Sequence, residues 1–345
     1  MTGKQGSALV LMAWVLAACG GVASASARLP SPAGPNPDVA VSVGANRAEL
    51  ITDGATAANR LRQAMTSARV TIEAEIYEFD RADYAEAILG SLARGVRVTL
   101  IEDPSVGVNA ANADRLRAAG AEVRIFPDRR RQIDHVKLLI IDGRTAVFGG
   151  MNWGSRSWRN HDFDVAVSGP IVAHLESIFA RDLVASGGRG QLPPPPPPDP
   201  AELSLLTTYP AAEIRPAVLD AIAAASRSIF IEMYVMTDSE TITALSDSAR
   251  RGIAVFVLFD PNQDLNQLAA ARLRQAGVQV RFYRTSGEKL HAKAMVVDSR
   301  RLIVGSANWT SSGFLHNHEL DAVIESARLA SQALTRMEAD WAASA

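Results

Sequence analysis

The chain has 345 residues, of which 48% are hydrophobic and 21% are charged, and its formal net charge is −2 at pH 7. This length suits two lobes of about 150 residues each, and the composition excludes a largely disordered chain. A net charge so close to zero is not typical of a nucleic-acid binder, but it does not exclude a local basic groove.

The N-terminal segment has the features of a bacterial export signal, in which Lys4 precedes an apolar run over residues 8–18. Two cleavage sites compete. The letters "ASA" before Arg28 suit an ordinary signal peptidase, whereas "LAAC", which ends at Cys19, resembles a lipobox and predicts a lipid on that cysteine. Both interpretations predict export, and we favour the lipoprotein.

After this leader, helical and strand patterns alternate along the chain. Apolar residues recur with helical spacing over residues 57–68, and residues 70–77 then alternate as a strand does. An amphipathic helix is expected over residues 81–95, with Gly95 at its C-terminal end, followed by a buried strand over residues 96–101. A further short helix and strand follow. This order predicts an α/β fold with a mostly parallel sheet between helices.

The same series of segments occurs twice. The block "RGVRVTLIEDP" at residues 94–104 recurs as "RGIAVFVLFDP" at 251–261, and "NHDFDVAV" at 160–167 recurs as "NHELDAVI" at 317–324, both 157 residues later. A constant offset across several blocks indicates an internal duplication.

The duplication and the proline-rich stretch between the copies predict the organisation of the chain. Consecutive prolines favour an extended spacer. The expected segments are a lipoprotein-type signal peptide at 1–18, a flexible tether at 19–46, a first repeat at 47–186, a linker at 187–200 and a second repeat at 201–345.

Each copy contains one sparse polar motif in apolar sequence, "HVKLLIIDGRTAVFGGMN" at 135–152 and "HAKAMVVDSRRLIVGSAN" at 291–308. The pattern predicts a β-hairpin. With a two-residue loop at Gly143 and Arg144, Lys137 would lie opposite Gly150 and His135 opposite Asn152, and the second copy would repeat this register.

Each hairpin would therefore present an imidazole, an ammonium and a carboxamide from one sheet edge, a combination that suits phosphate chemistry. Lysine attracts phosphate oxygens, asparagine donates hydrogen bonds to them, and histidine attacks phosphorus or moves protons. Two copies that face each other would place one histidine on each side of a phosphodiester, which explains why the motif occurs twice.

The pattern resembles the HKD signature of the phospholipase D superfamily, His-x-Lys-x4-Asp-x6-Gly-Ser-x-Asn. The second copy matches throughout, whereas the first has Gly150 where serine is usual. The resemblance covers both repeats. It implies two similar α/β repeats packed about a pseudo-two-fold axis, with one shared active site.

The resemblance also implies roles for individual residues. His135 would be the nucleophile that forms a phosphohistidine, and His291 would protonate the leaving alcohol and then activate water. Asp162 and Glu319 would each orient a catalytic histidine, and the alternative is that they are surface acids at the start of a strand. The groups expected to hold the phosphoryl oxygens, with no metal or other cofactor, are Lys137, Lys293, Asn152 and Asn308.

Other positions are weaker candidates. Asp142 and Asp298, at the hairpin turns, are expected to be structural. Gly150 and Ser306 would lie beside the substrate, and Trp153 and Trp309 would contact it or pack under the hairpins. The cluster Arg129–Arg131 would attract a polyanion or form a solvated loop. The spacing of His161, His316 and His318 fits no standard zinc pattern.

These observations predict a monomeric, exported, lipid-anchored phosphodiesterase that hydrolyses phospholipid head groups or transfers the phosphatidyl group, with a phospholipid and a membrane as its partners. The enzymatic alternative is a metal-independent endonuclease. The non-enzymatic alternative is a scaffold that retains the fold. The motif would contact only the phosphodiester, so it does not identify the rest of the substrate.

Overall fold

The computed structural model describes residues 40–127, 132–190, 202–284 and 287–344. The expected signal peptide, the lipidation site Cys19, the cluster Arg129–Arg131 and most of the proline-rich linker lie outside the described residues. No helix within these ranges is long and apolar enough to cross a bilayer.

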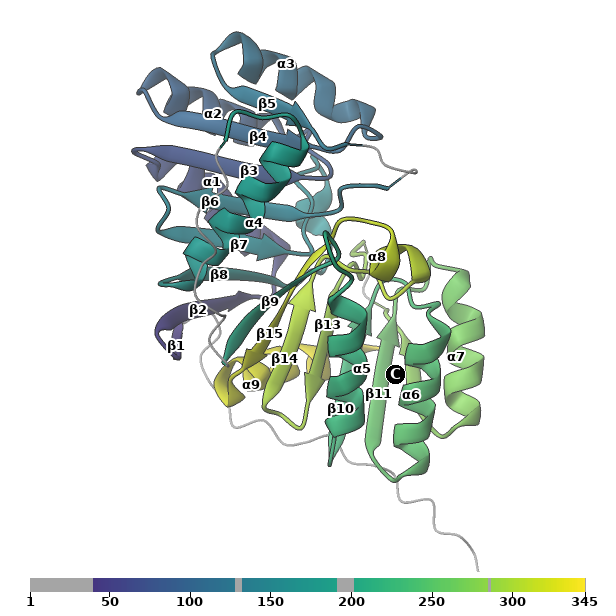
Figure 1. The fold of residues 1–345 in the computed structure, drawn as a ribbon. Helices are drawn as coiled ribbons and strands as arrows, with labels where there is room; N and C mark the ends of the chain where they lie inside the picture. Colours follow the sequence, from purple (N-terminus) through teal and green to yellow (C-terminus); the bar gives the residue numbers. More distant parts are fainter. Residues whose placement is uncertain (1–39, 128–131, 191–201, 285–286, 345) are drawn as a thin grey trace, which may run out of the picture.

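The first copy forms a sheet with the strand order β1-β2-β8-β7-β6-β3-β4-β5 (Figure 1). Its strands are β1 Val41–Val43, β2 Asn46–Ile51, β3 Thr71–Ile76, β4 Arg97–Glu102, β5 Glu122–Ile125, β6 Lys137–Ile141, β7 Thr145–Gly149 and β8 Asp164–Ser168. Its α-helices are α1 Gly54–Ser67, α2 Ala82–Ala93, α3 Ala110–Ala118 and α4 Ile171–Ala185. Strand β1 begins inside the range that the sequence assigns to the tether, so the folded part starts earlier than expected.

The second copy forms a sheet with the equivalent order β12-β11-β10-β13-β14-β15-β9. Its strands are β9 Leu203–Thr207, β10 Ser228–Met233, β11 Ala254–Phe259, β12 Gln279–Phe282, β13 Lys293–Val297, β14 Arg301–Gly305 and β15 Leu320–Glu325. Its α-helices are α5 Ile214–Ala224, α6 Ser239–Arg250, α7 Leu265–Gln275, α8 Ser311–Leu315 and α9 Ala327–Ala343.

The two similar α/β repeats are confirmed, but the expectation of a mostly parallel sheet is wrong. Only β3, β4 and β5 pair in parallel in the first sheet, as do β10, β11 and β12 in the second, and the remaining pairs are antiparallel. The crossover helices α2, α3, α6 and α7 impose the parallel pairs, whereas short hairpin connections such as β6–β7 require antiparallel ones. Both sheets are therefore mixed.

Local sequence signals explain where the elements begin and end. The Asp53 carboxylate accepts hydrogen bonds from the backbone N–H groups of Ala55 and Thr56, at 3.1 Å each, and so caps α1. Gly95, the expected helix stop, has a φ of 87° directly after α2. Its pseudo-equivalent Gly252 has a φ of 90° after α6. A left-handed residue at this point turns the chain into the next strand.

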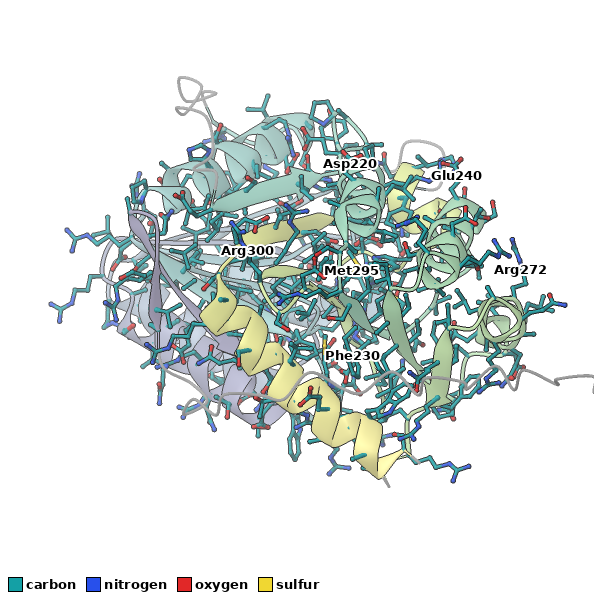
Figure 2. All side chains as sticks on the ribbon, turned by 90° about the horizontal axis from the view of Figure 1, so that it is seen from below. Asp220, Phe230, Glu240, Arg272, Met295 and Arg300 are labelled. Atoms are coloured by element: carbon teal, nitrogen blue, oxygen red, sulfur yellow. The ribbon has the colours of Figure 1, made fainter. Side chains whose placement is uncertain are left out.

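The two copies share one core. A single hydrophobic cluster joins the inner faces of both sheets to the buried sides of α4 and α9, whereas separate clusters lie under α1–α3 and under α5–α7. Phe230 belongs to the shared cluster and Met295, on the neighbouring strand, to the outer one, while Glu240 and Arg272 project into solvent (Figure 2). Because the copies pack so closely, side chains from both can meet at one site.

Candidate active site

The hairpins β6–β7 and β13–β14 carry the two polar motifs. Leu138 pairs with Phe148 and Ile141 with Thr145, so the loop has three residues and the register lies one residue away from the expected one. The second hairpin shows the same shift. His135 is therefore not directly opposite Asn152, and the expected register is wrong.

Asp142 accounts for the shift because it belongs to the loop rather than to the strand. Its φ of 55° is left-handed, a conformation that aspartate tolerates better than most residues. Its carboxylate accepts hydrogen bonds from the backbone N–H groups of Arg69, Val70 and Thr71, at 2.7–3.1 Å. Asp298 makes the equivalent contacts in the second copy. Both aspartates therefore tie the hairpin turn to the start of the neighbouring central strand, well away from the histidines.

Backbone hydrogen bonds beside the two histidines connect the two copies. The backbone N–H of His135 donates to the carbonyl of His318, and that of His291 donates to the carbonyl of His161, both at 2.8 Å. A Cβ atom placed on Gly150 would lie only 3.6 Å from the carbonyl oxygen of Gly305. The two motifs thus meet at one place.

The acids Glu319 and Asp162 also contact the copy to which they do not belong. Nδ1 of His135 lies 2.9 Å from Oε2 of Glu319, and Nδ1 of His291 lies 2.8 Å from Oδ1 of Asp162. The histidine of each motif is therefore oriented, through Nδ1, by an acid from the other copy. All four side chains are at most 8% exposed. Neither copy could build a complete site alone.

The two lysines lie beside the histidines in a desolvated environment. The ammonium groups of Lys137 and Lys293 donate to the carbonyls of His135 and His291, and Nζ of Lys293 lies 3.1 Å from Nε2 of His291. Burial lowers the pKa of Lys137 to about 8 and that of Lys293 to about 7. A bound phosphate anion would raise these lysine pKa values again and so favour the charged ammonium groups, as expected of a phosphate-binding site.

The pKa values of the two motif histidines, His135 and His291, are also lowered. Burial is the main cause, and the neighbouring lysine charges add to it against the opposing effect of Glu319 or Asp162. The pKa of His291 falls to about 3. Both rings are therefore neutral in the empty site near pH 7, a state in which an imidazole nitrogen is a nucleophile.

Asn152 and Asn308 complete the polar lining. Buried Asp164 accepts a hydrogen bond from the N–H of Met151, and its counterpart Asp321 accepts one from that of Ala307, so each aspartate fixes the residue before an asparagine. Among the described residues, neither carboxamide oxygen has a hydrogen-bond partner. Such an oxygen accepts a hydrogen bond only from a donor, such as a hydroxyl group, whereas contact with a phosphoryl oxygen would use the amide N–H groups.

Ser306 and Gly150 have a different role from the expected contact with substrate. Ser306 Oγ donates to Glu319 Oε2 at 2.6 Å and accepts from the N–H of Leu320 at 3.0 Å, so it positions the acid. A Cβ atom on Gly150 would lie 2.6 Å from Oδ1 of Asp162. Glycine at this position therefore makes room for the shorter acid, which explains the departure of the first motif.

Trp153 and Trp309 are each 1% exposed and do not line the site. Trp153 packs edge-to-face against Phe79 and Tyr84, and Trp309 packs against Phe314. The expectation that they contact substrate is wrong, and the alternative of packing beneath the hairpins is what the structure shows. The strand-like bridges Phe79–Trp153 and Met236–Trp309 hold them there.

Tyr77 and Tyr234 are not among the expected site residues, and they lie half-buried at the ends of β3 and β10. The Tyr77 ring lies 5.0 Å from that of His135, and the Tyr234 ring 4.9 Å from that of His291. Each ring also faces the lysine of its own copy, at 5.2 and 5.3 Å. Their recurrence at the repeat offset was the signal that could have identified them.

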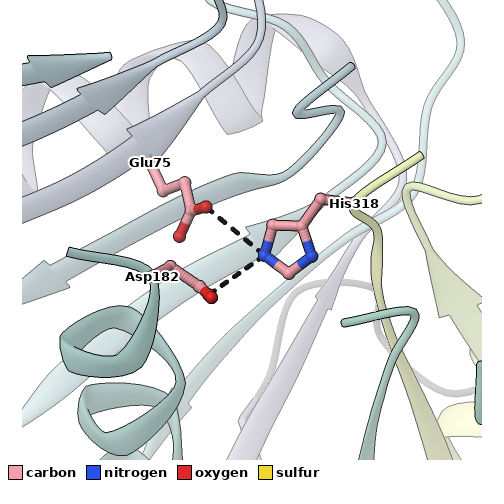
Figure 3. Close-up of side chains that lie close together, drawn as sticks. All are labelled: Glu75, Asp182 and His318. Atoms are coloured by element: carbon pink, nitrogen blue, oxygen red, sulfur yellow. Dashed lines mark hydrogen bonds and ion pairs between the residues drawn. The ribbon is translucent and has the colours of Figure 1, made fainter. Parts of the chain in front are cut away.

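Two further histidines, absent from the expected catalytic set, occupy buried clusters behind the site. Nε2 of His318 lies 3.0 Å from Asp182 and 3.4 Å from Glu75, as Figure 3 shows. Nε2 of His161 lies 2.6 Å from Glu232 and 3.3 Å from Asp340. His316, the third histidine considered for a metal site, is exposed.

These clusters fit a protonated imidazole better than a metal ion. The aspartate oxygen that faces each imidazole also accepts from an arginine, Arg181 in one cluster and Arg336 in the other. Burial alone would lower the pKa of His318, but the charges of Asp182 and Glu75 raise it well above its usual range. The pKa of His161 is likewise raised, against the effect of burial, by Glu232 and Asp340.

Known proteins resemble this chain over most of its length. Residues 61–183 and 218–341 match the family described as "Cardiolipin synthase, PLD-like domain". Cardiolipin synthase A of Pseudomonas syringae pv. syringae (strain B728a) is 29% identical over 335 residues, which cover 86% of this chain and 68% of that protein. The same enzyme of Pseudomonas putida (strain W619) is 27% identical over 334 residues, with the same coverage. The chain thus spans about two thirds of the length of these relatives.

Solved structures share the fold at low sequence identity. Phosphatidylserine synthase of Haemophilus influenzae Rd KW20 has a TM-score of 0.67 at 14% identity, and covers 89% of this chain and 87% of its own. Polyphosphate kinase of Porphyromonas gingivalis has a TM-score of 0.61 at 14% identity, and covers 84% of this chain and 46% of its own. These likenesses concern the fold alone.

Proposed function

The chain belongs to the phospholipase D superfamily, and we propose that it transfers or hydrolyses the phosphatidyl group of phospholipids through a phosphohistidine on His135. The crossed pairs His135–Glu319 and His291–Asp162 carry this proposal, because they supply two oriented imidazoles beside two lysines. The relatives named cardiolipin synthase A support a lipid substrate and favour transfer over hydrolysis.

In the first step, Nε2 of His135 attacks phosphorus and the bond from phosphorus to the head-group oxygen breaks. A proton passes from His291 to that oxygen, and the alcohol leaves. The two lysines and two asparagines hold the phosphoryl oxygens as negative charge grows on them. Because the bound phosphodiester is an anion, it raises the pKa of His291 from its value in the empty site and allows the ring to carry this proton.

In the second step, neutral His291 accepts the proton of an incoming hydroxyl group. The hydroxyl oxygen attacks phosphorus, the nitrogen–phosphorus bond breaks, and His135 returns to its starting state. An alcohol acceptor gives phosphatidyl transfer, and water gives hydrolysis. The same residues serve both outcomes, so the acceptor alone decides between transferase and hydrolase activity.

A parallel assay tests the function. Vesicles of phosphatidylglycerol, phosphatidylcholine or cardiolipin, and separately single-stranded DNA, are incubated with the protein in EDTA, with glycerol added as an acceptor alcohol. We expect head-group exchange or release from lipid to exceed DNA cleavage and to persist in EDTA. Efficient DNA cleavage that collapses between low and physiological salt would instead identify a nuclease. No turnover of any substrate would favour a scaffold.

We also infer export and a lipid anchor at Cys19 from the leader sequence. The Cys19→Ser variant should move the protein from the membrane fraction to the soluble exported pool. A wild-type protein that is already soluble, with Arg28 at its N-terminus, would show that the "ASA" site is used instead.

A further inference from the structure

The two buried histidine clusters are pseudo-symmetric copies of one arrangement. Glu75 corresponds to Glu232, and His161 to His318, at the repeat offset of 157 residues. The aspartates Asp182 and Asp340, on α4 and α9, correspond within one residue. An aromatic ring stacks on each imidazole, Phe126 on His318 and Tyr283 on His161.

Each cluster joins the two copies. His318 belongs to the second copy, and both of its carboxylate partners, Glu75 and Asp182, belong to the first. The N–H of His318 donates to the carbonyl of Ile133, and its carbonyl accepts from the N–H of His135, both at 2.8 Å. His318 is thus fixed by side chain and backbone to the copy that contains His135.

The residue after each of these histidines is an acid that orients a catalytic histidine. Glu319 follows His318 and contacts His135, and Asp162 follows His161 and contacts His291. Adjacent residues in extended chain point to opposite sides, so one side chain can anchor the dipeptide while the other reaches into the site. Moving the anchor would therefore move the acid.

We propose that His318 and His161 are positioning residues for opposite halves of the reaction, His318 for the nucleophile His135 and His161 for the acid–base His291. Each anchors, through ion pairs to the other copy, the acid that orients one catalytic histidine. This proposal rests on the proposed function for the order of events. It assigns separate kinetic roles to two clusters that look alike.

The leaving group separates the two roles. A p-nitrophenyl ester of phosphatidic acid needs no proton on departure, so its first step depends on His135 but not on His291. A natural alcohol needs both histidines in the first step. The second step needs His291 to activate the acceptor, whichever leaving group was used.

The experiment measures the burst of nitrophenol and the steady-state rate for His318→Gln and His161→Gln. We expect His318→Gln to slow the burst at least tenfold. We expect His161→Gln to keep the burst within about threefold of wild type, to slow the steady state at least tenfold and to accumulate phosphoenzyme. The control is His316→Gln, an exposed histidine two residues from His318, which should change neither rate more than twofold.

The single variants remove the positive imidazolium and leave buried carboxylates without a partner of opposite charge, which could cause misfolding. Double variants that also neutralise one carboxylate control for this effect. The pairs His318→Gln with Glu75→Gln and His161→Gln with Glu232→Gln should fold, as thermal melting will show, and should retain the same division between burst and steady state. Equal loss of both rates in all four variants would overturn the proposal.

Two other results are informative. Lipid turnover by the wild type, with no phosphoenzyme even in the His291→Ala variant where the second step is blocked, would contradict the phosphohistidine step of the proposed function. A stoichiometric divalent metal in the purified protein, lost in His318→Gln, would overturn the protonated imidazole and show that the cluster is a metal site.

Discussion

Glu319, from the second copy, places Oε2 2.9 Å from Nδ1 of His135 in the first copy. Asp162, from the first copy, makes the reciprocal contact with His291 at 2.8 Å. The duplication therefore does more than supply two histidines. The acid that orients each histidine comes from the other copy. An enzyme built this way requires both copies in fixed contact, which the shared core between the sheets provides.

Removing the charge of either acid should impair turnover without abolishing binding. The variants Glu319→Gln and Asp162→Asn keep the size of the side chain but lose the carboxylate that stabilises an imidazolium. We expect kcat to fall about 10²- to 10⁴-fold with little change in KM. The control Glu240→Gln lies on the exposed face of α6 and should behave as wild type. Steady-state kinetics within threefold of wild type for Glu319→Gln would remove the acid from the mechanism.

Gly150→Ser should be harmful, although it restores the usual family residue. Its Cβ would meet Oδ1 of Asp162 at 2.6 Å and displace the acid that orients His291. We expect at least a tenfold loss of kcat. The double variant Gly150→Ser with Asp162→Glu copies the Ser306–Glu319 pair of the second copy and should recover much of it. A single variant with full activity would show that the space is not limiting.

Substrate capture should weaken in mild alkali. The pKa values of Lys293 and Lys137, about 7 and 8, mean that both ammonium charges are present below pH 7 and are lost as the pH rises through these values. A phosphodiester keeps one negative charge over this range, so kcat/KM should fall between pH 6.5 and 8.5. Lys293→Arg stays charged and should flatten this decline. An unchanged decline in that variant would assign it to another group.

Stability should fall over a similar range for a different reason. Burial is the main cause that raises the pKa of Asp164 to about 8 and that of Asp321 to about 7. The unfolded aspartates titrate near pH 4, so the folded state holds extra protons and loses stability as the pH rises from about 4 to 8. Urea unfolding of Asp321→Asn should show a loss between pH 5 and 8 that is smaller by roughly 2 kcal/mol. The exposed control Asp220→Asn should retain the wild-type loss, and the same result for Asp321→Asn would contradict the assignment.

Much of this architecture can be predicted from the sequence because the duplication shows the same pattern of residues in two copies. The constant offset located both repeats, and the matched His, Lys and Asn positions identified residues that the fold brings together. The α/β class followed from alternating periodicities. The sequence predicts too much parallel pairing because the strands that pair antiparallel, such as β8 and β15, carry no sequence signal of their place in the sheet.

Other features depended on information that residue types alone do not carry. The hairpin register turned on the left-handed conformation of Asp142, which the capped backbone of the neighbouring strand stabilises. The burial of Trp153 follows from packing against Phe79 and Tyr84, distant in sequence. The partner of each orienting acid could not be read from one copy, because the contact crosses to the other.

The covalent intermediate provides the most direct test of the central claim, that His135 is the nucleophile and His291 the acid–base group. The His291→Ala variant, mixed with a phosphatidyl substrate that has a p-nitrophenyl leaving group and a radiolabelled phosphate, should retain about one label per chain. Peptide mapping should place the label on His135, and His135→Ala should retain none. Label on His291 in the His135→Ala variant, with none on His135 in the His291→Ala variant, would reverse the two roles and contradict this mechanism.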